Sequence, residues 1–126
     1  MEIQYHNNRD KFVGSVTSSL MNYDKIFLIT QKSIIAHNIL PEELINTANI
    51  LLYTCKENEQ CKSFKEVNKL VDYLLKNKCN KKSLLIGIGG GSVTDLSGFV
   101  SSIYMRGIAH ILIPTTLLGM VDASIG

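Results

Sequence analysis

The sequence predicts a single α/β domain with an open parallel sheet and flanking helices, and three observations support this fold class. Four short apolar runs alternate along the chain with stretches of helical periodicity. The apolar runs contain few polar residues, as is typical of parallel strands that are buried on both faces. The chain has 126 residues, of which 45% are hydrophobic and 19% charged, and this size suits one core rather than two.

The predicted elements follow one another in the order of a β-α-β unit. Strands are expected at residues 25–30, 49–54, 83–88 and 109–113. The clearest helix covers residues 63–76, with apolar residues at helical spacing at Val67, Leu70, Val71, Leu74 and Leu75. Ser63 and Glu66 form its capping box, and weaker helical patterns cover residues 9–20 and 41–48. Right-handed crossovers then place ligands beyond the carboxyl ends of the strands.

Composition excludes several classes of function. The net charge of +2 is spread over mixed acidic and basic residues, so no basic stripe is available for nucleic acid. The N-terminus lacks the pattern of a secretory signal, which predicts a cytoplasmic protein. Residues 108–125 are apolar but contain His110, Pro114 and Asp122, which argues against a membrane span. Neither disulfide spacing nor metal-ligand spacing occurs among the histidines and the three cysteines, Cys55, Cys61 and Cys79.

A cluster of glycines follows the strand predicted at residues 83–88 and opens a helix. Backbone amides in such a loop can approach a phosphate closely, and the helix N-terminus adds partial positive charge. The alternative is a tight turn in which glycine only supplies an unusual φ angle. Three consecutive glycines exceed that need, so we favour phosphate binding. The helix that follows is predicted to bury one face, formed by Val93, Leu96, Val100 and Ile103.

The Rossmann fingerprint does not describe this loop. Ser92 stands where the last glycine of that fingerprint belongs, and no acid follows about 20 residues later. The loop also follows a later strand rather than the first, so any dinucleotide is held by another α/β topology.

Three charged residues after the glycine cluster are weighed as site residues. Asp95 is placed in the first helical turn, where a carboxylate either caps the helix or accepts hydrogen bonds from a ribose or nicotinamide group. Asp122 shares a helical stripe with Thr115, and a carboxylate in so apolar a segment indicates a site rather than surface exposure. Arg106 precedes a glycine at a helix end, where a cation is ordinary capping chemistry.

Three linked motifs resemble those of the sugar phosphate cyclases, and among these most closely the 3-dehydroquinate synthase family. They are Gly89-Gly90-Gly91-x-x-x-Asp95-x-x-Gly98-Phe99, Tyr104-Met105-Arg106-Gly107 and Pro114-Thr115-Thr116-Leu117-Leu118-x-x-Val121-Asp122-Ala123-Ser124-x-Gly126. Upstream, Glu59-Gln60-Cys61-Lys62-Ser63 is similar to the family's Gly-Glu-x-x-Lys-Ser. The resemblance implies the N-terminal NAD-binding α/β domain of such an enzyme, with the helical metal-binding domain missing from residues 1–126.

The resemblance also implies roles for the matching residues. The residues implied to bind NAD are Glu59, Lys62, Gly90, Gly91, Ser92, Asp95, Thr115, Thr116 and Asp122. The first two would lie on the adenosine side, the glycine-loop residues at the phosphates and ribose, and the threonines at the nicotinamide half. Asp122 would also meet the substrate. Arg106 would hold the substrate phosphate in the active site of the neighbouring subunit of a homodimer, so Asp122 and Arg106 are the catalytic candidates.

Members of this family convert a seven-carbon phosphorylated keto sugar acid, DAHP, into 3-dehydroquinate with release of phosphate in the shikimate pathway. The resemblance implies transient oxidation by NAD, phosphate elimination, re-reduction and ring closure. A divalent metal, zinc or cobalt, would polarise the oxidised group and would be bound by residues beyond Gly126. Two positions depart from the family pattern: Asn58 stands for a glycine before Glu59, and Thr30-Gln31 lacks an acid after the first strand.

Other interpretations stay open at this stage. A cyclase that makes a valiolone or inosose ring would share much of the NAD-binding half, although Met105 and the Leu117-Leu118 pair favour dehydroquinate synthase. Metal-dependent glycerol and alcohol dehydrogenases share the architecture but have a different sequence after Pro-Thr-Thr. The sequence stops at Gly126 directly after an apolar helical pattern, so we expect the chain to be incomplete and inactive alone. A non-catalytic nucleotide-binding or dimerisation fragment is the alternative from another class.

Overall fold

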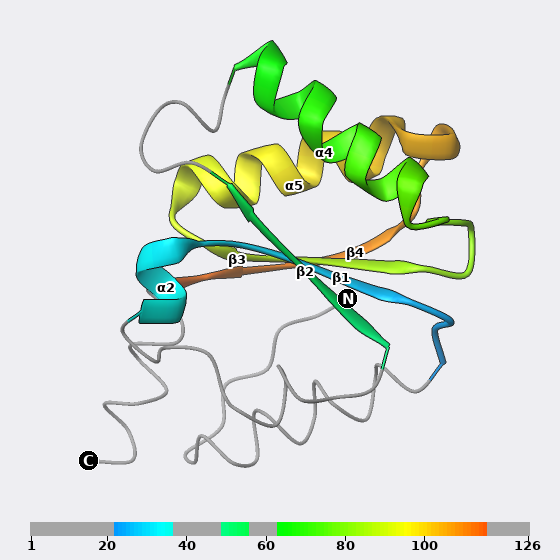
Figure 1. Cartoon of the computed structure of the whole chain (residues 1–126), viewed down its shortest axis with the longest axis horizontal. Coiled ribbons are helices and arrows are strands. Elements are labelled where there is room, and N and C mark those ends of the chain that lie inside the picture. Colours follow the sequence, from blue (N-terminus) through cyan, green and yellow to red (C-terminus); the bar gives the residue numbers. More distant parts are fainter. Residues whose placement is uncertain (1–21, 37–48, 56–62, 116–126) are drawn as a thin grey trace.

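Four parallel strands form the centre of the structure. The computed structural model describes residues 22–36, 49–55 and 63–115, and Figure 1 shows their arrangement. The strands pair in the order β2-β1-β3-β4, and their bounds are β1 Ile26–Gln31, β2 Ile50–Cys55, β3 Leu84–Gly89 and β4 Ala109–Pro114. All three pairings are parallel. The four predicted strands are confirmed, each displaced by at most one residue at either end.

The two inner strands differ from the two outer ones in burial. Every residue of β3 is buried, and so is every residue of β1 except the half-buried Gln31. The prediction that all four strands are buried on both faces is wrong for β2 and β4, where Leu52 and His110, for example, are exposed. Among the described strands these two lie at the sheet edges, so each has only one neighbour. Apolar composition does not reveal a strand's place in the sheet.

Two long helices cover the same face of the sheet (Figure 1). Helix α4 spans Phe64–Lys76 and helix α5 spans Gly91–Ile103, while the short helix α2, Lys32–Ala36, follows β1 directly and was not predicted. Ser63 caps α4 as predicted, because its Oγ accepts a hydrogen bond of 3.2 Å from the Glu66 amide. The buried carboxylate of Glu66 accepts a 3.0 Å hydrogen bond from the Tyr53 hydroxyl, which ties α4 to β2. The helices predicted at residues 9–20 and 41–48 lie outside the described residues.

The core lies between these helices and the sheet. Its main members are Phe27, Ile29, Leu70, Leu74, Leu85, Val93, Leu96 and Val100. Two residues predicted to face this core are exposed instead, Leu75 by 59% and Ile103 by 49%. Leu75 lies at the margin of the apolar stripe of α4, and Ile103 is the last residue of α5, so neither reaches the sheet.

Helix α5 approaches β3 closely at Gly87. A Cβ atom added at Gly87 would lie 2.5 Å from the Cβ atom of Ser97, so only glycine fits beneath the helix. Ser97 is fully buried, and its Oγ makes no hydrogen bond within the described part of the chain. The small serine therefore serves close packing, and this packing fixes where α5 begins relative to β3.

We predict that Gly87→Ala lowers the free energy of unfolding by about 1–3 kcal/mol, the usual cost of overpacking a core. The second substitution Ser97→Gly should recover part of this loss, because it removes the side chain that the new methyl group would strike. Urea unfolding of the two single variants and the double variant measures this coupling. Gly98→Ala is the control, since its Cβ would meet only the end of Leu112, at 3.3 Å. Wild-type stability of Gly87→Ala would contradict the packing argument.

Candidate functional site

The carboxyl ends of the strands bring the glycine loop and Thr115 to one edge of the sheet. Gly89, the last residue of β3, is the register partner of Pro114, the last residue of β4. The loop that leads into α5 therefore begins beside the half-buried Thr115. In Figure 1 this edge is at the left, where α5 starts and α2 follows β1. The structure thus places the glycine loop and Thr115 at the carboxyl edge of the sheet, where ligands were expected.

The glycine loop lies beside the point where the strand order reverses. The chain passes from β1 to β2 on one side and returns to β3 on the other, so the switch point of the sheet lies between β1 and β3. Pairing between these two strands stops at Ile29 and Gly87, before either strand ends. Open α/β sheets bind ligands in the crevice outside the strand ends at such a point.

Thr30 joins the two strands beyond their last paired residues. Its hydroxyl is buried and donates a 2.7 Å hydrogen bond to the Ile88 carbonyl, next to the glycine loop. The Cys55 thiol in turn donates to the Thr30 carbonyl at 3.4 Å, which links β2 to the same place. Sequence reasoning did not find this contact. Its only signal was a threonine at the end of an otherwise apolar run.

Helix α5 begins at this edge of the sheet, and no side chain caps its N-terminus. Gly90 is its N-cap and has no side chain to satisfy the first amides. The Gly90 carbonyl accepts hydrogen bonds of 3.1 Å from both the Val93 and the Thr94 amides. The amides of Gly91 and Ser92 precede these first helical bonds, so they point out of the helix toward its positive end. A phosphate is the ligand class that such an end favours.

The three glycines of the loop serve different purposes. A Cβ atom at Gly89 would lie 2.8 Å from the Cβ atom of Val93, so packing requires glycine there. At Gly90 and Gly91 an added Cβ would meet no atom of the described residues within 4 Å. Gly90 has an ordinary φ of −75°, and among the described glycines only Gly107 has a positive φ. The interpretation of this cluster as a turn that needs unusual φ angles is therefore wrong, and two of its glycines leave bare backbone beside open space.

Asp95 does not occupy the position predicted for it. Helix α5 begins at Gly91, so the first turn contains no acid and Asp95 lies one turn further on, exposed. The capping role fails for the same reason, because the N-cap is Gly90. The ribose or nicotinamide contact stays a prediction.

Arg106 lies at the opposite end of α5. The helix has 13 residues, which at 1.5 Å per residue separates its two ends by about 20 Å. Figure 1 places the turn that carries Arg106, in orange, at the sheet edge opposite the glycine loop. Arg106 is exposed in a 3₁₀ turn, Tyr104–Arg106, that is followed by Gly107. The loop and the guanidinium of one chain therefore cannot hold the same small ligand.

Several predicted site residues lie outside the described residues. They are Glu59, Lys62, Thr116 and Asp122. Within residues 22–36, 49–55 and 63–115 no three His, Cys, Asp or Glu side chains come together as a metal site. Cys55 and Cys79 are buried, and neither forms a disulfide within these ranges. In the same ranges no helix is both long enough and apolar enough to span a membrane.

Comparisons with known proteins give relatives of this chain in sequence and in fold. The family profile of the 3-dehydroquinate synthase N-terminal region matches residues 52–126. The chain is 36% identical over 119 residues to the 3-dehydroquinate synthase of Thermoplasma volcanium. That alignment covers 93% of this chain and 33% of the relative, so the chain spans about a third of the relative's length.

Two solved structures share the fold. One is 2-deoxy-scyllo-inosose synthase complexed with carbaglucose-6-phosphate, NAD⁺ and Co²⁺, with a TM-score of 0.66 and 23% identity over 79% of this chain and 28% of that one. The other is 2-epi-5-epi-valiolone synthase from Streptomyces hygroscopicus with NAD⁺ and Zn²⁺ bound. It has the same TM-score and identity, over 98% of this chain and 36% of that one.

Proposed function

The chain belongs to the 3-dehydroquinate synthase family, and on that premise we propose that it is the NAD-binding part of a 3-dehydroquinate synthase. The enzyme would convert DAHP into 3-dehydroquinate with release of phosphate in the shikimate pathway. The observation that carries the proposal is the bare backbone at Gly90 and Gly91, beside open space at the switch point of the sheet.

The pyrophosphate of NAD would bind at the N-terminus of α5. The amides of Gly91 and Ser92, which precede the first hydrogen bonds of the helix, supply donors there, and the helix end supplies partial positive charge. The two glycines allow the pyrophosphate to approach the backbone, because neither carries a side chain into the open space. Thr115 would meet the nicotinamide half from the neighbouring end of β4.

The remaining NAD contacts are proposed from the family pattern. Glu59 and Lys62 would lie on the adenosine side, Asp95 near the ribose, and Thr116 with Asp122 at the nicotinamide and substrate. When bound, NAD supplies a reversible oxidation of a substrate hydroxyl, which acidifies the neighbouring C–H bond. A zinc or cobalt ion would be held by residues outside these 126.

Arg106 would act in the active site of a second subunit. It lies about 20 Å from the loop of its own chain, too far to share that site. A guanidinium can bind two oxygens of a phosphate at once, which suits the phosphate group of DAHP. We therefore propose a homodimer in which each subunit supplies Arg106 to its partner.

The reaction itself separates this proposal from its closest rival. The full protein, supplied with NAD and zinc, should release inorganic phosphate from DAHP and form 3-dehydroquinate. An assay of inorganic phosphate and chromatographic detection of 3-dehydroquinate measure the two events. One solved structure that shares the fold is an inosose synthase complexed with carbaglucose-6-phosphate, so glucose 6-phosphate is the alternative substrate. Turnover of glucose 6-phosphate without turnover of DAHP would replace the proposed substrate.

The glycine loop offers a test that separates binding from stability. Gly91→Ala should keep the free energy of unfolding, because the added methyl group meets nothing within 4 Å. It should nevertheless weaken NAD binding about tenfold or more, since the methyl group would stand where the pyrophosphate approaches. Gly89→Ala should instead lower the free energy of unfolding, because the added methyl group would strike Val93. Calorimetric NAD titration and urea unfolding measure both properties, and wild-type NAD affinity of Gly91→Ala would refute the site.

A substitution of Arg106 tests its proposed contact with the substrate phosphate. Arg106→Ala should raise the KM for DAHP about tenfold or more and leave the Kd for NAD unchanged, because its contact is to the substrate phosphate. Equal weakening of both would contradict this role.

Mixed dimers show which chain supplies the arginine. Arg106→Ala and Gly91→Val subunits, each impaired alone, should regain activity when unfolded together and refolded as a mixture. In a mixed dimer the Gly91→Val subunit would lend its intact Arg106 to the intact NAD site of its partner. If the refolded mixture regains no activity, Arg106 acts either in the active site of its own chain or in no active site.

A further inference from the structure

We propose that Lys81 and Tyr104 are positioning residues that hold Arg106 in place for the substrate phosphate. This inference rests on the role proposed above for Arg106. Lys81 lies in the segment between α4 and β3, which none of the quoted family motifs includes, and Tyr104 is the first residue of the turn that carries Arg106.

The turn that carries Arg106 has an unfavourable backbone. Met105 has φ 48° and ψ 36°, and Arg106 has φ 65°, so two consecutive residues with side chains adopt the left-handed region. This region is disfavoured for any residue with a Cβ atom, and Gly107 follows with φ 111°. Such a conformation persists only where the surrounding structure determines it.

Both ends of the turn are fixed to the segment of residues 77–83. At the first end, the buried Tyr104 hydroxyl donates a 2.9 Å hydrogen bond to the Cys79 carbonyl. At the other end, the Lys81 ammonium donates a 2.8 Å hydrogen bond to the Gly107 carbonyl. The Gly107 amide donates to the Tyr104 carbonyl at 2.8 Å, which closes the turn between the two anchors.

The anchoring segment is itself held by a set of hydrogen bonds. The Lys82 amide donates to Asn80 Oδ1 at 2.7 Å, and the Asn80 amide donates to Ser83 Oγ at 3.0 Å. The Lys82 carbonyl accepts from the Asp24 amide at 3.0 Å, which connects the segment to the residues before β1. The segment therefore provides a defined support for the turn.

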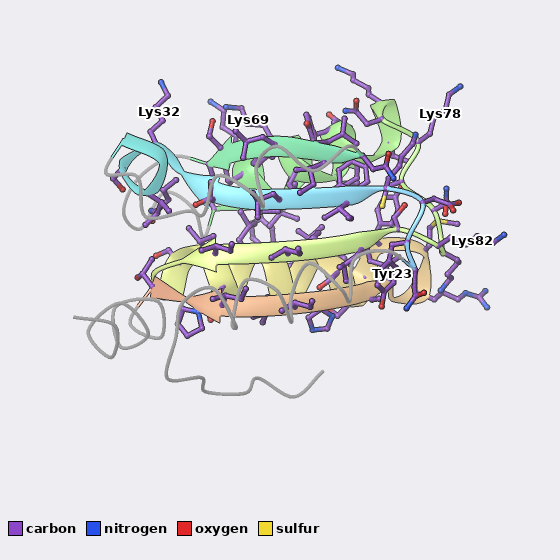
Figure 2. All side chains as sticks on the ribbon, turned by 90° about the horizontal axis from the view of Figure 1, so that it is seen from below. Tyr23, Lys32, Lys69, Lys78 and Lys82 are labelled. Atoms are coloured by element: carbon purple, nitrogen blue, oxygen red, sulfur yellow. The ribbon has the colours of Figure 1, made fainter. Side chains whose placement is uncertain are left out.

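Protonation and charge agree with these roles. Burial, assisted by the neighbouring Cys79, raises the pKa of Tyr104, so the phenol keeps its proton near neutral pH and remains a donor. Figure 2 shows Lys78 and Lys82 at this same end of the sheet, far from Lys32, the first residue of α2. Together with Lys81 they add positive charge at the end of the sheet that carries the Arg106 turn, which favours an anionic ligand there.

The test uses two variants and two matched controls in the full enzyme. Lys81→Met and Tyr104→Phe each remove one anchor. Lys69→Met removes an exposed lysine of α4, and Tyr73→Phe removes a tyrosine bond to the Leu52 carbonyl, 2.8 Å long. Both control residues lie in α4, outside the segment 77–83 and outside the Arg106 turn.

We expect each anchor variant to raise the KM for DAHP about twofold to tenfold, as for the loss of one hydrogen bond. The kcat and the Kd for NAD should change little, the controls should match the wild type, and Lys81→Arg should restore the KM because it can still donate to Gly107. In an Arg106→Ala background, Lys81→Met should have no further effect on KM.

Three results would overturn the inference. These are an unchanged KM in both anchor variants, an equal change in the controls, or an undiminished effect of Lys81→Met when Arg106 is already alanine. If Arg106→Ala alone leaves the KM unchanged, the proposed role of Arg106 fails and the positioning role fails with it. If Arg106→Ala raises the KM but the anchor variants do not, only the positioning role fails.

Discussion

The close contact between α5 and β3 at Gly87 is the constraint on which the rest of the structure depends. Because Gly87 has no side chain and Ser97 has a small one, the helix lies directly on the central strand. Its N-terminus then falls at the carboxyl edge of the sheet, beside the switch point between β1 and β3. Its other end carries the Tyr104–Arg106 turn to the opposite edge. One packing contact thereby positions both the glycine loop, where NAD is proposed to bind, and Arg106, which is proposed to bind the substrate phosphate.

Much of this fold follows from local patterns in the sequence. The four apolar runs gave the strands, and Ser63 marked the start of α4, because burial and capping are properties that neighbouring residues determine. The order of the strands depends on pairing between distant segments, so the partial exposure of β2 and β4 could not be read from their composition. The Thr30 bond to Ile88 joins residues 58 positions apart, and no local pattern announces it.

The candidate site was predictable to a similar extent. Three successive glycines indicated a phosphate loop. Only the structure shows that packing requires glycine at Gly89 but not at Gly90 or Gly91. Asp95 was misplaced because the sequence does not show which of the three glycines is the N-cap. The N-cap is Gly90, so the helix begins at Gly91 and Asp95 lies beyond the first turn. Glu59, Lys62, Thr116 and Asp122 lie outside the described residues, so their roles stay predictions.

The length of α5 has a consequence of its own. The exposed residues of its second half, Phe99, Ser102 and Ile103, can accept many substitutions, because they lie outside the core and away from the loop. A single inserted or deleted residue is different, since it would turn everything downstream by about 100° and shift it by about 1.5 Å along the axis. Arg106 would then leave the face from which it projects, even though every residue of the loop was intact. We therefore expect α5 to vary in sequence but not in residue number among proteins that use both of its ends.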